Sequence, residues 1–244
     1  MRRMKNKKLK SILSLSGYFL LIIALCFVGA FVFHSYYYES VYVSGNSMAP
    51  TLLGADEDKD GAIVDFGIVD AHSSAINNIK RFDIVSTYFP DDYDSNGNLA
   101  LTAKKKIKRV VGMPGDTFTI EDGVLRVKNG EDYVEVPYTF NVEKTKAKDT
   151  TDGPITLLED EYWLLGDNRN NSTDCAKIGK PVTKKNIVGV LVAIEGRAKL
   201  KLKKMVCPAC GSTYSSGSIC NKCSTQLRAE FDLVNKVYKW PKYY

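Results

Sequence analysis

The sequence predicts a mainly β protein: an antiparallel, barrel-like or sandwich domain behind one apolar N-terminal helix, with a small cysteine-rich segment at its C-terminal end. An uncharged run of 23 residues spans 11–33, short β-branched stretches alternate with turn residues from about 41 to 200, and two C-x-x-C pairs follow. With 244 residues, the chain has room for one sizeable domain and an accessory piece.

The apolar run SILSLSGYFLLIIALCFVGAFVF predicts a membrane anchor, since 23 helical residues span about 34 Å and a hydrocarbon core is about 30 Å thick. Six basic side chains precede it, which predicts a single-pass protein with a cytoplasmic N-terminus and the remainder outside. The alternative is a cleaved signal peptide, but its apolar part usually has about 7–15 residues, and Val28-Gly29-Ala30 is a weak cleavage site.

The net charge of +6 does not predict a nucleic-acid partner. Six of the 34 basic residues precede the apolar run, where they more often set membrane orientation, and others cluster at 104–109 and 199–204. We therefore expect membrane lipid as a partner and no nucleic acid.

Short apolar stretches bounded by Gly, Asp, Asn and Pro predict the strands. They are Asp83–Tyr88, Lys106–Gly112, Thr117–Ile120, Val124–Val127, Tyr162–Leu165 and Val188–Ile194. The polar segments 54–80, 91–103 and 141–156 are expected to be loops.

Ser47, in the turn-prone segment SGNSMAPTL, is a candidate nucleophile, and a serine hydroxyl needs a base within hydrogen-bond reach. The two histidines are poor candidates, because His34 lies at the membrane boundary and His72 in a polar loop. A lysine acts as a base only when it is neutral, which burial among apolar groups promotes by lowering its pKa. Lys108 meets this condition, since it follows Ile107 in KKIKRVVGMPGD.

Four segments occur in a fixed order: SGNSMAPTL (44–52), FDIV (82–85), KRVVGMPGD (108–116) and GDNRNNSTD (166–174). Behind an anchor, they resemble the successive conserved boxes of bacterial type I signal peptidases. These S26-type, membrane-bound Ser-Lys endopeptidases remove signal peptides from exported proteins. The resemblance covers about residues 10–195.

The resemblance implies that Ser47 is the nucleophile and Lys108 the general base. It also implies that the backbone N–H of Ser47, placed by Gly45 and Asn46, donates to the oxyanion. Some relatives carry a serine hydroxyl two positions before the nucleophile. Gly45 stands there in this chain, as in the subgroup with a GxSM pattern, so a second donor must come from elsewhere.

In the last box, Ser172 matches a residue whose hydroxyl orients the lysine amine. Asp167 and Asp174 match structural carboxylates, and Arg169 is expected to pair with Asp174. The family usually continues this box with Ser-Arg, but Cys175 follows here. This departure weakens the expected support of the loop more than the chemistry.

The resemblance also implies small apolar substrate pockets, which favour alanine one and three positions before the cut. Their expected walls are Val43, Met48, Leu52 and Ile107. The expected partners are the signal peptides of secretory preproteins.

The segment CPACGSTYSSGSICNKC contains two C-x-x-C knuckles that suit a structural zinc ion. The expected ligands are Cys207, Cys210, Cys220 and Cys223. If this segment lies outside the cytoplasm, two disulfides are the alternative. The ribbon is a candidate surface for a protein partner. The last stretch, AEFDLVNKVYKWPKYY, is amphipathic and is expected to pack on the ribbon or touch the membrane.

The expected divisions are a cytoplasmic basic tail (1–10), a transmembrane helix (11–33), a signal-peptidase-like catalytic domain (34–200) and a zinc-ribbon-like segment (201–244). No catalytic cofactor is expected. Two alternatives remain: a catalytically impaired relative that binds a partner through its ribbon, and a related self-cleaving repressor. The anchor and the absence of a DNA-binding helical domain in the sequence disfavour the repressor.

Overall fold

The structure, a computed structural model, describes residues 2–55, 59–142 and 151–243, with side chains from residue 17 onward apart from 240 and 241. The chain divides into two compact units, Met1–Glu39 and Ser40–Tyr244. The first unit is mostly helix and the second is mostly strand, as the sequence predicts.

Helix α1 (Arg2–Tyr37) forms the first unit. Within the part of the chain that the structure describes, it is the one helix long and apolar enough to cross a membrane, over Gly17–Tyr37. Its large apolar side chains are exposed, including Phe27 and Phe31 at 72% each. An exposed apolar helix of this length is suited to lipid.

The second unit is built on a nine-stranded antiparallel sheet with the order β1-β2-β11-β3-β4-β9-β10, and β12 and β13 also pair with β11. Its strands are β1 (Tyr38–Tyr42), β2 (Ile63–Asp70), β3 (Ile84–Thr87), β4 (Lys106–Gly112), β9 (Glu161–Leu165), β10 (Val182–Thr183), β11 (Ile187–Val206), β12 (Thr213–Tyr214) and β13 (Arg228–Tyr243).

A smaller antiparallel sheet has the order β7-β6-β5-β8. Its strands are β5 (Thr117–Glu121), β6 (Val124–Asn129), β7 (Asp132–Glu135) and β8 (Ile155–Thr156). Short helical turns connect the strands: α2 (Ser73–Asn77), η1 (Pro90–Asp92), α3 (Cys175–Ile178) and η2 (Lys184–Asn186).

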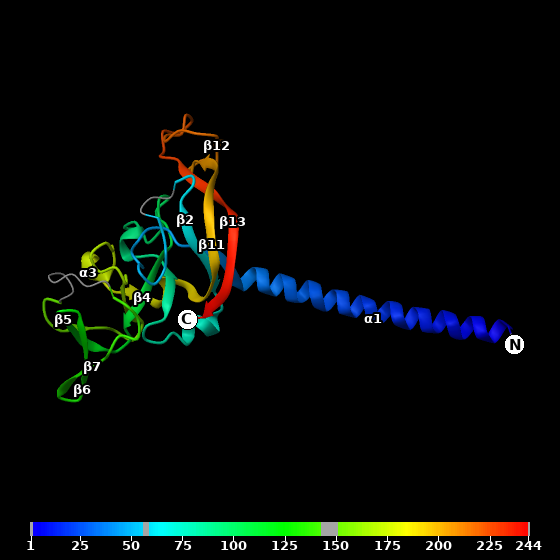
Figure 1. Cartoon of the computed structure of the whole chain (residues 1–244), viewed down its shortest axis with the longest axis horizontal. Helices are drawn as coiled ribbons and strands as arrows, with labels where there is room; N and C mark the ends of the chain where they lie inside the picture. The colour runs from blue at the N-terminus through cyan, green and yellow to red at the C-terminus, as the bar shows by residue number, and fades with distance from the viewer. Residues whose placement is uncertain (1, 56–58, 143–150, 244) are drawn as a thin grey trace. The chain divides into compact units, whose positions relative to one another are not determined.

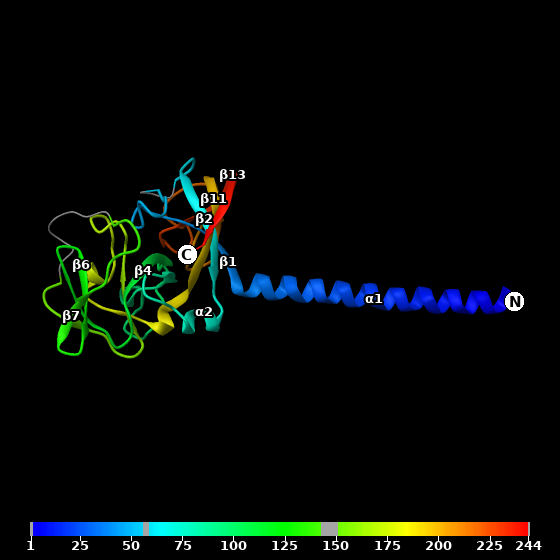
Figure 2. The ribbon, with the colours of Figure 1, turned by 60° about the horizontal axis from the view of Figure 1, so that its bottom comes forward.

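Strand β11 organises the second unit, because β2 pairs along one edge while β3 and β13 pair along the other. Figure 1 shows β2, β11 and β13 side by side, and they remain adjacent in Figure 2. The strand runs without a break through position 200, where the sequence analysis places a domain boundary. The cysteine segment is therefore the tip of a hairpin whose strands, β11 and β13, belong to the main sheet.

The last stretch is a strand that pairs with β11, and its contact with the membrane stays a prediction. It lies along β11, with Tyr238 opposite Gly196. A Cβ atom at Gly196 would lie 2.2 Å from the Val237 carbonyl oxygen, so this close pairing requires glycine. Phe66 of β2 lies on the other side of Gly196. The rings of Tyr238 and Phe66 pack edge-to-face, with 5.4 Å between their centroids.

The prediction of a loop over 54–80 is wrong, because β2 lies inside this segment and pairs with β11. Asp65 and Gly67 make the sequence IVDFGIVD look like a loop. The Asp65 carboxylate instead accepts hydrogen bonds from the Leu53 N–H and from Arg197 Nε. Gly67 permits the close approach of β11, since a Cβ there would lie 2.1 Å from the Ala193 carbonyl oxygen.

Two apolar clusters form the interior of the second unit, and a third lies at the cysteine tip. The larger cluster lies between the two sheets and includes Phe118 and Trp163, whose rings are 6.0 Å apart. The smaller one, which we call the turn cluster, contains Val43, Met48, Leu52, Val69, Ile84 and Leu191, with Val41, Ile107 and Ile194 packed against it. It fixes the segment that carries Ser47 to the main sheet.

Candidate active site

Ser47 lies in a compact turn between β1 and β2. Gly45 adopts the left-handed conformation, with φ of 75°, and the Ala49 N–H donates to the Asn46 carbonyl oxygen at 3.1 Å. A Cβ atom at Gly54 would lie 1.9 Å from the Gly45 carbonyl oxygen, so the turn closes only with glycine there. Met48 anchors the turn, since its side chain is buried in the turn cluster.

Lys108 lies on β4, which pairs with β3 and β9 and places the side chain inside the unit. A hydrogen bond of 2.7 Å joins Lys108 Nζ and Ser47 Oγ, two residues 61 positions apart in the sequence. Nζ also donates to the Ile107 carbonyl oxygen at 3.1 Å. The amine therefore stands where a base must stand to accept the proton of this hydroxyl.

The pKa of Lys108 is lowered from 10.5 to about 8, chiefly by burial. The carboxylates of Asp174 and Asp167 oppose this shift, and the positive charge of Lys106 adds to it. At pH 7 about one amine in ten is then neutral, against fewer than about one in a thousand at the ordinary pKa.

The segment after β9 closes over the turn. The Asn168 N–H donates to the Ser47 carbonyl oxygen at 3.0 Å. A Cβ at Gly166 would lie 2.4 Å from both that oxygen and Ser172 Oγ, so the approach requires glycine. The Asp174 carboxylate holds the segment by accepting from the backbone N–H groups of Gly166 and Ala176.

Asp167 is fully buried and carries a contact that the sequence analysis did not predict. It accepts two hydrogen bonds from Arg109, at 2.8 and 2.6 Å, and one from Thr51 Oγ1 at 2.5 Å. It thus ties the Ser47 turn to the strand that carries Lys108. The one available sequence signal was that Arg109 directly follows Lys108.

The predicted pairing of Arg169 with Asp174 is wrong. Arg169 Nε donates to the Gly166 carbonyl oxygen, and its guanidinium lies over the Tyr138 ring at 5.2 Å. The Asp174 carboxylate instead binds backbone N–H groups and caps α3. A carboxylate at the start of a helix is favoured there by unpaired N–H groups.

Ser172 does not make the predicted contact with the lysine amine. Its hydroxyl is buried against Gly166 and has no hydrogen-bond partner among the residues that the structure describes. The lysine is oriented instead by Ser47 and by the Ile107 carbonyl oxygen.

The predicted walls of the substrate pockets belong to the turn cluster. Val43, Met48 and Leu52 are each 1% exposed, and Ile107 is partly buried. In the sequence, Val43 precedes Ser47, Met48 and Leu52 follow it, and Ile107 directly precedes Lys108. Contact of these side chains with substrate stays a prediction. The oxyanion roles of Gly45 and Asn46 stay predictions as well.

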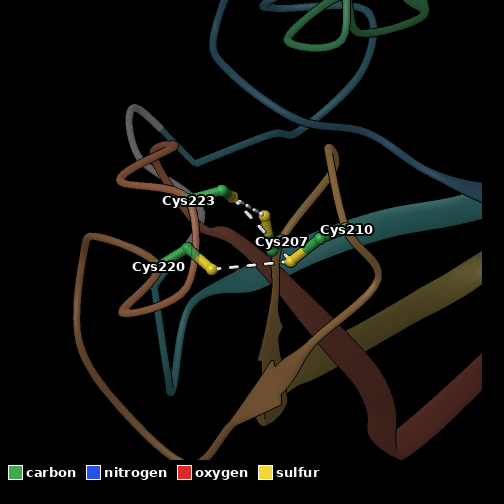
Figure 3. Close-up of side chains that lie close together, drawn as sticks. All are labelled: Cys207, Cys210, Cys220 and Cys223. Carbon is green, nitrogen blue, oxygen red and sulfur yellow. Dashed lines mark hydrogen bonds between the residues drawn. The ribbon is translucent and has the colours of Figure 1, made fainter.

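The four cysteines of the tip lie together (Figure 3), with their sulfur atoms within 4.8 Å of one another. Cys207 Sγ is 3.4 Å from Cys223 Sγ, and Cys210 Sγ is 3.6 Å from Cys220 Sγ. Four thiolates at about 2.3 Å from a tetrahedral ion lie about 3.8 Å apart, so this set fits a metal ion. All four are free thiols, so the disulfide alternative is not formed in this structure.

Two similar turns build the cluster. The Gly211 N–H donates to the Cys207 carbonyl oxygen, and the Ser224 N–H donates to that of Cys220. Gly211 and Ser224 both have positive φ, at 71° and 57°. Each knuckle thus places a cysteine pair by local backbone geometry.

A serine hydroxyl beside a buried lysine amine, on a mainly β fold, is the arrangement of hydrolases that use lysine in place of histidine. Residues 15–194 match the family described as signal peptidase, peptidase S26. The chain therefore belongs to the signal peptidase family, peptidase S26, whose members are serine endopeptidases.

Individual relatives agree with this family. Signal peptidase I P of Bacillus subtilis subsp. natto is 32% identical over 174 residues, which cover 70% of this chain and 82% of that protein. Signal peptidase I V of Bacillus subtilis strain 168 is 32% identical over 158 residues, which cover 61% and 80%. A solved signal peptidase I from Enterococcus faecalis V583 is 25% identical, with a TM-score of 0.36, over 47% of this chain and 97% of that one.

Proposed function

We propose that this protein is a membrane-anchored endopeptidase that removes N-terminal signal peptides from exported precursors and cuts after small residues. The observation that carries the proposal is the 2.7 Å hydrogen bond between Ser47 Oγ and a lysine whose pKa burial lowers to about 8. Family membership supplies the reaction class, and this contact supplies the residues.

In the first half of the reaction, the neutral amine of Lys108 takes the proton of Ser47 as Oγ attacks the carbonyl carbon of the residue before the cut. The oxyanion accepts a hydrogen bond from the Ser47 backbone N–H. As the C–N bond breaks, the Lys108 ammonium gives its proton to the leaving amine, and an acyl ester on Ser47 remains.

In the second half, Lys108 takes a proton from water as the water oxygen attacks the ester. The same proton then returns to Ser47 Oγ as the ester bond breaks. The products are the signal peptide with a free carboxylate and the mature protein with a free amine, and Ser47 and Lys108 are restored.

The membrane arrangement follows from α1 and its basic flank. The helix crosses the membrane once with its N-terminus in the cytoplasm, and the β unit lies outside, where the cleavage sites of signal peptides emerge. The positive-inside preference supports this orientation, and lipid contacts α1. The proposed divisions are a cytoplasmic tail (1–10), a membrane helix (11–33), a catalytic part (34–200) and a cysteine-bearing extension (201–244), whose strand β13 pairs with β11 of the catalytic part.

The four cysteines hold a structural zinc ion, and the reaction itself needs no metal. The sulfur spacing supports this assignment, because it matches a tetrahedral thiolate site. The ion would fix the hairpin tip, which is also the candidate surface for a protein partner. Metal analysis of the purified full chain, with thiol titration before and after metal removal, tests the assignment: about one zinc ion per chain is expected.

Cleavage of a precursor protein in detergent tests the proposed function. Ser47→Ala and Lys108→Ala should each lose activity by about a thousandfold or more, because the hydroxyl and amine act as a unit. Lys104→Ala is the matched control, since Lys104 is exposed two positions before β4, and its activity should stay within about threefold. Equal cutting by all variants contradicts the assigned residues. No cutting by the wild type favours the alternative of a catalytically impaired relative that binds a partner through its ribbon.

A further inference from the structure

The two cysteine knuckles repeat one backbone pattern, and a residue with a hydroxyl closes each of them. In the first knuckle, the Cys207 N–H donates to the Ser212 carbonyl oxygen at 2.9 Å. In the second, the Cys220 N–H donates to the Thr225 carbonyl oxygen at 2.8 Å. Ser212 and Thr225 therefore occupy equivalent positions, each two residues after the second cysteine of its pair.

The hydroxyls at these two positions contact the second cysteine of each knuckle. Ser212 Oγ lies 3.3 Å from Cys210 Sγ, and Thr225 Oγ1 lies 3.3 Å from Cys223 Sγ. Both of these cysteines are exposed. Each exposed cysteine of the tip thus has a hydroxyl from its own knuckle beside its sulfur atom.

Tyr214 supplies a third hydroxyl, and its contact joins the two knuckles. The residue lies on β12, directly after the first knuckle, and pairs with Met205 of β11. Its hydroxyl oxygen lies 3.2 Å from Sγ of Cys220, the first cysteine of the second knuckle. Cys220 is only 1% exposed, so water has little access to replace this contact.

A bound metal ion determines the direction of these hydrogen bonds. A thiolate has no proton, so it can only accept, and each hydroxyl must donate to it. A divalent ion balances only two of the four thiolate charges, and negative charge remains on the sulfur atoms. Because hydrogen bonds to a charged acceptor are stronger than those to a neutral one, the hydroxyls stabilise the metal-bound thiolates more than the free thiols.

We propose that the hydroxyls of Ser212, Tyr214 and Thr225 retain the zinc ion in the cysteine tip, and that Tyr214 contributes most. This inference rests on the proposed metal site and is independent of the proposed peptidase reaction. Tyr214 has the largest share because its partner is buried, whereas water can replace the other two hydroxyls at exposed cysteines.

The test measures the rate at which the full-length, zinc-loaded protein in detergent transfers its ion to a chromogenic pyridylazo chelator. Tyr214→Phe keeps the ring that packs on the apolar cluster of the tip and removes only the hydroxyl. Transfer should become about tenfold faster, the lower end of the range for groups that hydrogen-bond metal ligands. Ser212→Ala and Thr225→Val should each accelerate it by about threefold.

The cobalt-loaded protein provides a second readout, which a general loosening of the tip would not reproduce. A hydrogen bond lowers the energy of the sulfur lone pairs, so its loss makes the thiolate a better electron donor to the metal. The sulfur-to-cobalt charge-transfer band should therefore move to longer wavelength in Tyr214→Phe.

Two variants serve as matched controls. Ser216→Ala removes a hydroxyl that is exposed in the same tip and contacts no sulfur atom among the residues that the structure describes. It should release zinc at the wild-type rate. Thr225→Ser keeps the hydroxyl that Thr225→Val removes, so it should stay close to the wild type as well.

Transfer by Tyr214→Phe within about twofold of the wild-type rate, with an unchanged cobalt band, overturns the inference. Equal acceleration in Thr225→Ser and Thr225→Val also overturns it, because the hydroxyl would then not be the cause. A wild type that holds no zinc after loading overturns the metal site and the inference with it, whereas failure to cut a precursor contradicts only the peptidase function. If Tyr214→Phe does not fold, the Thr225 pair still decides.

Discussion

The Ser47–Lys108 pair and the cysteine cluster are built in opposite ways. The pair joins residues 61 positions apart, and its supporting bond from Thr51 to Asp167 spans 116 positions. The cysteines fall within 16 positions and are placed by two local turns. The first site therefore depends on the complete sheet, whereas the second depends on a short segment and the ion that it can hold.

The largest effect is expected from breaking the long-range support of the first site. Asp167→Asn leaves the Arg109 guanidinium, 5% exposed, without its carboxylate. Because an unpaired buried charge costs about 3–5 kcal/mol, the free energy of unfolding should fall by that amount, as measured by denaturant titration.

Asp91→Asn provides the control for this prediction, since the Asp91–Lys180 ion pair is more than half exposed on both sides. Its removal should change the stability by less than about 0.5 kcal/mol. Equal effects of the two substitutions would show that Asp167 does not support the site.

The two sites should also respond at different ends of the pH range. Since the amine of Lys108 must be neutral, kcat/KM should rise about tenfold per pH unit and level off near pH 8, the pKa that burial gives this lysine. A metal–thiolate site instead releases its ion when acid protonates the thiolates. Measurement of kcat/KM and bound metal from pH 5 to about 10 separates the two, and a rate that levels off below about pH 7 contradicts the lysine base.

The same lysine also affects stability. Between its folded pKa of about 8 and its unfolded pKa near 10.5, the unfolded chain binds more protons. The free energy of unfolding should therefore rise with pH in this window and stay constant with respect to Lys108 below it. Lys108→Met should remove the rise.

The smallest effect on catalysis is expected from metal removal. A chelator should loosen the hairpin tip, but kcat/KM for a reference precursor should stay within about threefold, because the contacts of Lys108 come from β4 and the Ser47 turn. Hydrogen exchange of residues 207–227 checks the first part and a cleavage assay the second. A loss of more than about tenfold would show that the tip is coupled to the catalytic pair.

Local patterns in the sequence predicted the features that depend on neighbouring residues. The apolar neighbours of Lys108 identified it, and the C-x-x-C spacing identified the cysteine cluster. Lys106–Gly112 was predicted with the bounds that the structure has.

Features that depend on distant partners were not predictable in this way. Arg109 has an ordinary sequence context, and its carboxylate lies 58 positions away. Strand β2 was missed because Asp65 is polar in the sequence, although Arg197 satisfies it at a separation of 132 positions. The final segment is amphipathic in the sequence, and nothing in its own residues indicates that it pairs with β11.

Strand β11 has a consequence for how this protein can be shortened. Residues Ala193–Val206 of this strand pair with β13, and a chain cut at residue 200 would leave the edge at 193–200 without a partner strand. Unpaired strand edges with alternating apolar residues recruit other chains and promote aggregation. Strand β13 of the C-terminal hairpin therefore covers an edge of the main sheet that would otherwise pair with other chains. A shortened form that stays in solution would need a charged residue or a proline along that edge.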